Sequence, residues 1–259
     1  MRLRFAFTKR KKILLTSALL TVALWVIEYF TIPILFSISA LVILGYVITY
    51  WVLDFDLKGQ EYIAFPLLTI SFAIALFFIS PLFGELFYHW IKIPISYIGF
   101  YLIFLTTNIL NISTIKPLPL VRAAWTSLHL IYFGLSFLLF SLLFWVPLYP
   151  VIIIGTIFLI TFFLSYPAYY LLLNELARGG HPFFYMLFTG LLMAELSFIM
   201  TFIEVPFYVK ALILGGSFYI ISGLIEHDLR GNLRRNVTFE YAAIAVLLSA
   251  ILLAFLFKI

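Results

Sequence analysis

The sequence predicts an all-α membrane protein: a polytopic bundle of about nine transmembrane helices, with the N-terminus inside and the C-terminus outside. Two observations predict this fold class. The 259 residues are 65% hydrophobic and only 10% charged, with a mean hydropathy of +1.17, whereas a soluble domain carries about 25% charged residues. Basic residues also gather in every second gap between the apolar stretches, the pattern that orients transmembrane helices.

Nine apolar stretches approach the length of about 20 residues that a helix needs to cross a bilayer. They cover residues 13–30, 32–53, 62–80, 93–110, 123–146, 150–173, 183–203, 207–225 and 239–257. The connections between them leave almost no chain for a soluble domain. We therefore expect one transmembrane domain over residues 1–259.

The first stretch follows a basic N-terminus at residues 1–12, an arrangement that signal peptides share. Its apolar run from Ile13 to about Tyr29 is longer than the apolar region of a signal peptide, and no small-x-small cleavage site closes it. We interpret this stretch as an uncleaved first helix.

Prolines support the predicted starts of the later helices. Proline is tolerated in a first turn because its missing N–H would have no intrahelical partner there. Pro33, Pro94, Pro150 and Pro182 lie at or just before such positions. Pro167 falls inside the sixth stretch, where it should kink the helix.

The 16 Lys and Arg residues give the orientation and support the helix count. Those predicted to lie inside are Arg2, Arg4, Lys9, Arg10, Lys11, Lys12, Lys58, Lys116, Arg122, Arg178, Arg230, Arg234 and Arg235. Only Lys92 and Lys258 fall in outer segments, and Lys210 lies near the outer end of the eighth stretch. A wrongly split or merged stretch would invert the alternation downstream.

Glu195 is the main candidate functional residue, because it lies near the midplane of the seventh stretch. At 100° per residue it falls away from the face formed by Gly190, Ala194, Ser197 and Thr201, so we expect it to point at a different neighbour. An ionisable residue inside a membrane suggests a proton carrier, a cation ligand or a cavity lining. The alternative is a protonated carboxyl that only holds helices together.

His129 is the second intramembrane candidate, on the inner third of the fifth stretch. A proton relay with Glu195 is one hypothesis. The two residues differ in depth by roughly 9 Å at 1.5 Å per residue, which argues against direct contact. The alternative is a neutral histidine that only forms hydrogen bonds.

Polar residues also gather at the predicted inner face. The candidates there are Asn108, Asn111, Lys116, Arg122, Arg178, His181, Asp228 and Arg230. Arginine binds phosphate in a bidentate manner, so these residues could form a site for an anionic lipid headgroup or a phosphate. The alternative is a solvated collar of positive charge that sets the topology.

Other features narrow the function. Cysteine is absent, which excludes disulfides, thiolate metal sites and cysteine catalysis. No catalytic, metal or cofactor motif such as Gly-x-Ser-x-Gly or His-Glu-x-x-His is present, so we expect no cofactor and lean against an enzyme. The net charge of +5 is explained by topology signals and headgroup contacts rather than by nucleic acid.

Two inner segments resemble a known family. Ile115-Lys-Pro-Leu-Pro-Leu-Val-Arg-Ala-Ala124 and the segment from Leu224 to Tyr241, which contains Glu-His-Asp-Leu-Arg-Gly-Asn-Leu-Arg-Arg, look like stretches of a family of bacterial multi-spanning membrane proteins, a domain of unknown function. The resemblance implies a protein of the prokaryotic cytoplasmic membrane and assigns no role to any residue.

Three functions remain open from the sequence. The first is a non-enzymatic membrane component or scaffold, whose cytoplasmic loops contact a protein partner, a second copy or lipid. The second is a transporter or channel that uses Glu195. The third is a lipid-processing enzyme at the inner leaflet, which would require Arg122, Arg178, His181 and Asp228 to converge.

Overall fold

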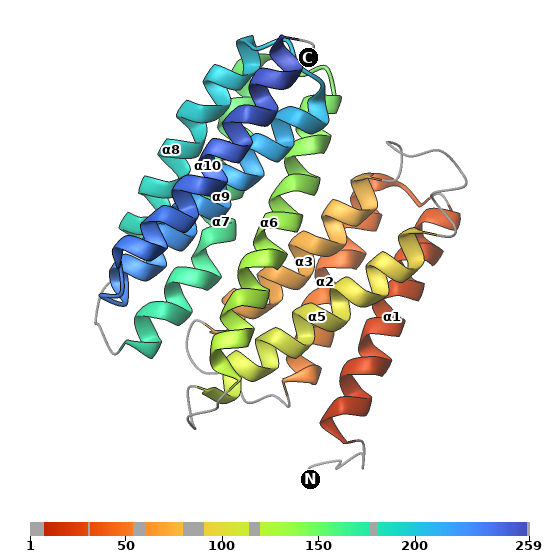
Figure 1. The fold of residues 1–259 in the computed structure, drawn as a ribbon. Coiled ribbons are helices and arrows are strands. Elements are labelled where there is room, and N and C mark those ends of the chain that lie inside the picture. Colours follow the sequence, from red (N-terminus) through yellow and green to blue (C-terminus); the bar gives the residue numbers. More distant parts are fainter. Residues whose placement is uncertain are drawn as a thin grey trace. The chain divides into compact units, whose positions relative to one another are not determined.

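A computed structural model describes residues 8–30, 32–53, 61–79, 91–113, 120–176 and 181–257. Within these ranges the chain forms nine α-helices and no strand (Figure 1). The helices are α1 (Lys9–Tyr29), α2 (Ile34–Val52), α3 (Glu61–Ile79), α5 (Lys92–Ser113), α6 (Val121–Trp145), α7 (Pro150–Glu175), α8 (Phe183–Phe202), α9 (Phe207–Leu229) and α10 (Arg235–Leu256).

All nine of these described helices are long and apolar enough to cross a membrane. The predicted stretches agree with the helix bounds to within four residues at each end. The all-α fold class is therefore confirmed. The side of the membrane on which each terminus lies remains a prediction.

The chain divides into two compact units, Met1–Leu128 and His129–Ile259. Helices α1, α2, α3 and α5 belong to unit 1, and α7 to α10 belong to unit 2. Helix α6 begins in unit 1 and continues into unit 2. The expectation of a single transmembrane domain stays a prediction.

In unit 1, α1 packs against α5 and α2, and α3 packs against α2 and α5. Glycine permits the close contact between α2 and α3, because a Cβ at Gly45 would lie 2.9 Å from Cγ1 of Ile70. One helical turn further along, the buried hydroxyl of Thr49 donates a hydrogen bond to that of Thr69 over 3.0 Å. Close backbones and buried hydroxyl pairs are typical of helices that associate in lipid.

A buried ion pair also joins two helices of unit 1. The Lys92 ammonium at the start of α5 donates to the Glu28 carboxylate, one residue before the end of α1. Lys92 was predicted to lie in an outer segment, and Glu28 lies at the corresponding end of its helix. Their contact places these two helix ends at the same level, as antiparallel neighbours require.

In unit 2, α8 packs against α7 and α9, and α10 packs against α9. The predicted small-residue face of α8 is buried at Gly190 and Ser197. A Cβ at Gly190 would lie 3.0 Å from the Phe158 ring of α7. In the same helix pair, the buried hydroxyls of Tyr169 and Thr189 share a hydrogen bond of 2.8 Å.

Helix α9 uses glycines on two faces to approach two neighbours. A Cβ at Gly215 would lie 3.3 Å from the Ser136 hydroxyl oxygen of α6. Gly216 and Gly223 instead face Leu248 and Tyr241 of α10, with distances of 2.5 Å and 2.2 Å from an added Cβ. Helix α9 therefore lies between α6 and α10 in unit 2.

Candidate functional site

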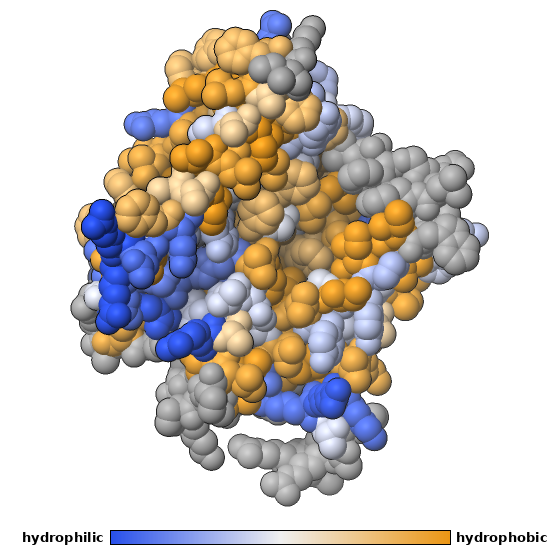
Figure 2. All heavy atoms as spheres, in the orientation of Figure 1, coloured by the Kyte–Doolittle hydropathy of each residue, from blue (hydrophilic) through white to orange (hydrophobic). Residues whose placement is uncertain are grey.

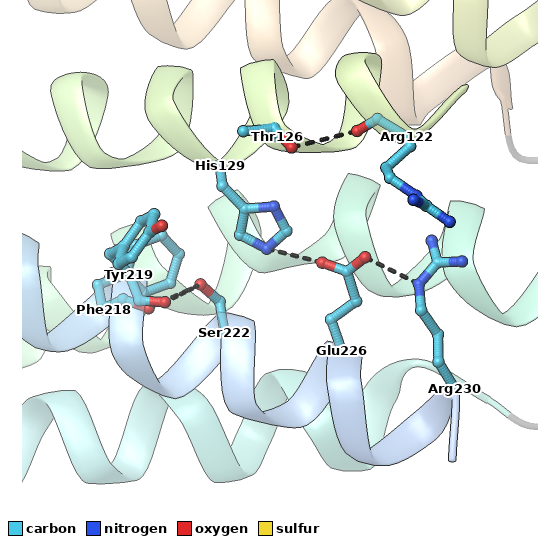
Figure 3. Close-up of polar contacts among 8 residues, drawn as sticks. All are labelled: Arg122, Thr126, His129, Phe218, Tyr219, Ser222, Glu226 and Arg230. Carbon is cyan, nitrogen blue, oxygen red and sulfur yellow. Dashed lines mark hydrogen bonds and ion pairs between the residues drawn. The ribbon is translucent and has the colours of Figure 1, made fainter. Parts of the chain in front are cut away.

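A polar cluster in unit 2 joins α6 to α9, and Glu226 is at its centre (Figure 3). Glu226 lies one turn before the end of α9. A carboxylate at that position faces the negative end of the helix dipole, so it needs nearby positive groups. His129 of α6 and Arg230, the residue that caps α9, lie on either side of it.

Each carboxylate oxygen of Glu226 accepts a different donor. The Nε2 atom of His129 lies 2.9 Å from Oε2, and the Nε atom of Arg230 lies 2.8 Å from Oε1. The Glu226–Arg230 contact joins residues four apart, the spacing that brings side chains together on one helix face. Glu226 and His129 are only 8% and 9% exposed. The cluster is therefore internal to the protein, close to one end of α9.

Aromatic rings pack beside His129 in this cluster. The His129 ring meets Tyr219 edge to face, with centroids 6.1 Å apart, and Tyr219 in turn contacts Tyr241 of α10. The Tyr241 hydroxyl group reaches α9 at Gly223, one turn before Glu226. These ring contacts link α10 to the helices that carry His129 and Glu226.

The cluster can hold two helices together, and the carboxylate is already occupied by two donors. Among the described residues, no group of three or more His, Asp or Glu side chains could hold a metal ion. Arg230, a candidate for a phosphate or headgroup site from the sequence, uses its Nε atom on Glu226. The geometry fits a structural role, in which these polar contacts hold α6 against α9.

Glu195 lies elsewhere in unit 2, on the exposed side of α8. Its direction away from Gly190 and Ser197 agrees with the expectation from helical spacing, since those two residues are buried. We expected Glu195 to contact a neighbouring helix, but among the described residues it makes no hydrogen bond or ion pair. The described carboxylate partner of His129 is Glu226.

The remaining predicted residues are distributed over both units. Asn108 and Asn111 are buried on α5 of unit 1, and Arg122 is exposed at the start of α6. His181 and Asp228 are exposed in unit 2. Lys116 and Arg178 lie outside the described residues. Convergence of the inner-face candidates on one phosphate site therefore remains a prediction.

On the face of unit 2 drawn in Figure 2, hydrophilic residues gather at the α9–α10 junction. Figure 2 shows hydrophilic residues where α9 leads into α10, and mainly hydrophobic residues along α10 beyond that point. The exposed residues at this junction include Asn232, Arg234, Arg235 and Asn236. Such a boundary between polar and apolar surface is expected where a helix leaves the hydrocarbon layer.

Glu226 was not predicted as the centre of a polar cluster, although a signal was present in the sequence. The useful pattern was Glu226 with Arg230 at i and i+4. His129 could not be added from spacing, because the contact depends on how α6 packs against α9.

These helices define the class of protein: a polytopic helical membrane protein, in which the buried carboxylates Glu28 and Glu226 of the described ion pairs lie near helix ends. Residues 116–255 match the family described as "Protein of unknown function (DUF5656)", and the chain belongs to this family. The match confirms the resemblance to a family of unknown function, whereas the bacterial origin remains a prediction. No curated protein and no solved structure matches the chain.

The family match covers α6, α7, α8 and α9 and nearly all of α10. It therefore includes both the Glu226 cluster and the exposed Glu195, and excludes α1, α2, α3 and α5.

Proposed function

We propose that this protein is a non-enzymatic component of a membrane complex, and that α8 contacts a partner within the membrane. The observation that carries the proposal is the exposed Glu195 carboxyl on an otherwise apolar helix surface. Its neighbours Leu191, Phe198 and Ile199 are 51%, 53% and 52% exposed. Ionisable side chains in membrane helices usually face a protein interior or a partner rather than lipid.

The depth of Glu195 makes exposure to lipid costly. At 1.5 Å per residue, Glu195 lies about 18 Å from the first residue of α8 and about 10 Å from the last. Lys and Arg can reach the membrane surface through their long stems, whereas Glu has a shorter side chain. A protein partner that covers Glu195 would remove this cost.

The proposal includes an orientation and a location. The basic segments support a prokaryotic cytoplasmic membrane with the α9–α10 junction on the cytoplasmic side, where Arg234 and Arg235 would contact anionic headgroups. Because the chain has no cysteine, a single cysteine at Asn232 can be labelled selectively. A membrane-impermeant maleimide should label it only from the cytoplasmic side. Labelling from the outside would show that the orientation is the opposite of the one proposed.

Photo-cross-linking in native membranes tests the contact on α8. A photoreactive amino acid at Phe198 should give an adduct with another membrane polypeptide. The same group at Leu253, which is 50% exposed on α10, is the matched control and should label lipid. Lipid adducts alone from both positions would contradict the proposal.

A flux assay tests the transport alternative. Wild type and Glu195→Gln would be reconstituted in liposomes, and proton and cation flux recorded with ion-sensitive dyes. We expect no flux from either protein. Flux in wild type that disappears in Glu195→Gln would identify a transporter or channel and overturn the proposed function.

A further inference from the structure

The exposed side of α8 carries a regular seam of large side chains with Glu195 near its middle. Phe184, Phe188, Leu191, Glu195, Phe198 and Phe202 follow one another at spacings of 4, 3, 4, 3 and 4 residues. The five apolar members are all at least half exposed, from 51% to 72%. This alternation is the spacing with which one helix packs along another.

The opposite side of α8 is already used within unit 2. Met186, Gly190, Met193 and Ser197 are buried there. The exposed seam is therefore a second helix-packing face. Glu195 is its only ionisable member, so the chemistry of the occupant must be complementary to a carboxyl group.

A second copy of this chain does not supply that complement. A two-fold interface brings the same surface of both copies together, so two Glu195 carboxyl groups would meet. Two carboxylates that share a site disfavour each other's charge. A different chain avoids this conflict.

No described Lys or Arg of this chain lies in the middle of a helix, as Glu195 does. Every Lys or Arg within a described helix lies in its first turn: Lys9, Arg10, Lys11, Lys12, Lys92, Arg122, Lys210 and Arg235. Lys210 is nearest to Glu195 along the chain, and its Nζ atom lies over the Phe144 ring of α6, 5.5 Å from the centroid.

We infer that the α8 seam docks a transmembrane helix of a different protein that carries a lysine or arginine at the level of Glu195. This inference rests on the proposed function and specifies the partner's chemistry. The cation and the carboxylate neutralise each other within the hydrocarbon layer, and the apolar members of the seam pack on both sides of the pair. The partner's cation determines which helix is accepted, because lipid-facing apolar residues alone are weakly selective.

A peptide probe tests this directly. The full-length protein would be placed in phosphatidylcholine vesicles with a synthetic leucine-alanine transmembrane peptide that carries one lysine at the depth of Glu195. Control peptides carry leucine or glutamate at the same position. Association is measured by energy transfer to a dye on a single cysteine at Asn232.

The lysine peptide should associate with wild type about 10-fold more strongly than the leucine peptide, in line with interhelical polar contacts in membranes. Glu195→Gln should remove this preference. Glu204→Gln is the matched control, because it changes another exposed glutamate just beyond the end of α8, and it should leave the preference intact.

Four results would overturn the inference. One is equal association of the lysine, leucine and glutamate peptides with wild type. Another is a lysine preference that survives Glu195→Gln. The third is a dimer of this chain that is lost in Glu195→Gln, and the fourth is a cross-link from Phe198 to unit 1 of the same chain. In the last two cases the seam would be occupied by this chain itself. A cross-link from Phe198 to another protein without a lysine preference would preserve the proposed function and reject only the partner's basic chemistry.

Discussion

Glu226 and Glu195 are carboxylates on neighbouring helices of unit 2, and their surroundings are opposite. Glu226 is 8% exposed and accepts from both His129 and Arg230. Glu195 is exposed, lies nearer the middle of its helix, and has apolar neighbours on its face. Glu226 has its partners within the chain, whereas Glu195 has none among the described residues and is assigned a partner contact only by the proposed function.

The largest expected effect on stability comes from removing the Glu226 carboxylate. Glu226→Leu leaves His129 and Arg230 without their shared acceptor, and it should lower the free energy of unfolding by about 3 kcal/mol, as for other buried pairs that lose one partner. Glu226→Gln keeps the shape of the side chain and should cost less. Denaturant-induced unfolding in mixed micelles measures both.

Glu195→Leu is the matched control for this measurement. A loss below about 1 kcal/mol in Glu226→Leu would put the cluster in the range of exposed ion pairs. The contrast between the two carboxylates would then be wrong.

A smaller effect is expected at Gly223, where the Tyr241 ring packs onto α9 beside the cluster. An added Cβ would lie 2.2 Å from the Tyr241 oxygen, so Gly223→Ala must displace this side chain and should cost about 1–2 kcal/mol. Gly134→Ala is the control, because an added Cβ there meets no atom within 4 Å. Thermal unfolding should separate the two variants.

The Tyr241→Ala background sharpens this prediction. Without the ring, Gly223→Ala should become nearly neutral. An equal cost in both backgrounds would show that the contact with Tyr241 is not the cause.

The hydrogen bond between Tyr169 and Thr189 should contribute less. Tyr169→Phe removes the hydroxyl group from a buried pair 2.8 Å apart and should cost about 1 kcal/mol. A double-mutant cycle with Thr189→Val measures the coupling between the two side chains. Additive costs would mean that the hydrogen bond does not couple α7 to α8 in the folded protein.

The smallest effect on the isolated protein is expected for Glu195→Gln. Because Glu195 is exposed and has no described partner, the change in unfolding free energy should stay within about 0.5 kcal/mol. A large loss of stability in the purified monomer would mean that Glu195 has a partner within its own chain. That result would remove the difference between the two carboxylates.

The sequence predicted the helices to within four residues at each end but did not predict which helices are neighbours. Length and hydropathy are local properties, and each described helix is bounded by polar residues, proline or a charged turn that is visible in the sequence. The direction of Glu195 away from Gly190 and Ser197 also followed from helical spacing. Helical spacing could not show whether another helix covers the side of α8 that carries Glu195.

The candidate site shows the same division. The Glu226–Arg230 contact lies within four residues of one helix end and was available from the sequence. The contacts from His129 to Glu226 and from Lys92 to Glu28 join residues far apart in the chain. Such contacts depend on which helices are neighbours and on how each is rotated.

The sequence by itself determined that this chain is a helical membrane protein with nine predicted spans and basic residues near the helix ends. Those features follow from the cost of placing charge and unpaired backbone groups in hydrocarbon, which acts on each segment separately. Only the tertiary structure decided that Glu226 is buried between two donors and that Glu195 is exposed. The physical reason is that burial depends on neighbouring helices, and the rotation of each helix is set by close contacts such as those at Gly190, Gly215 and Gly223.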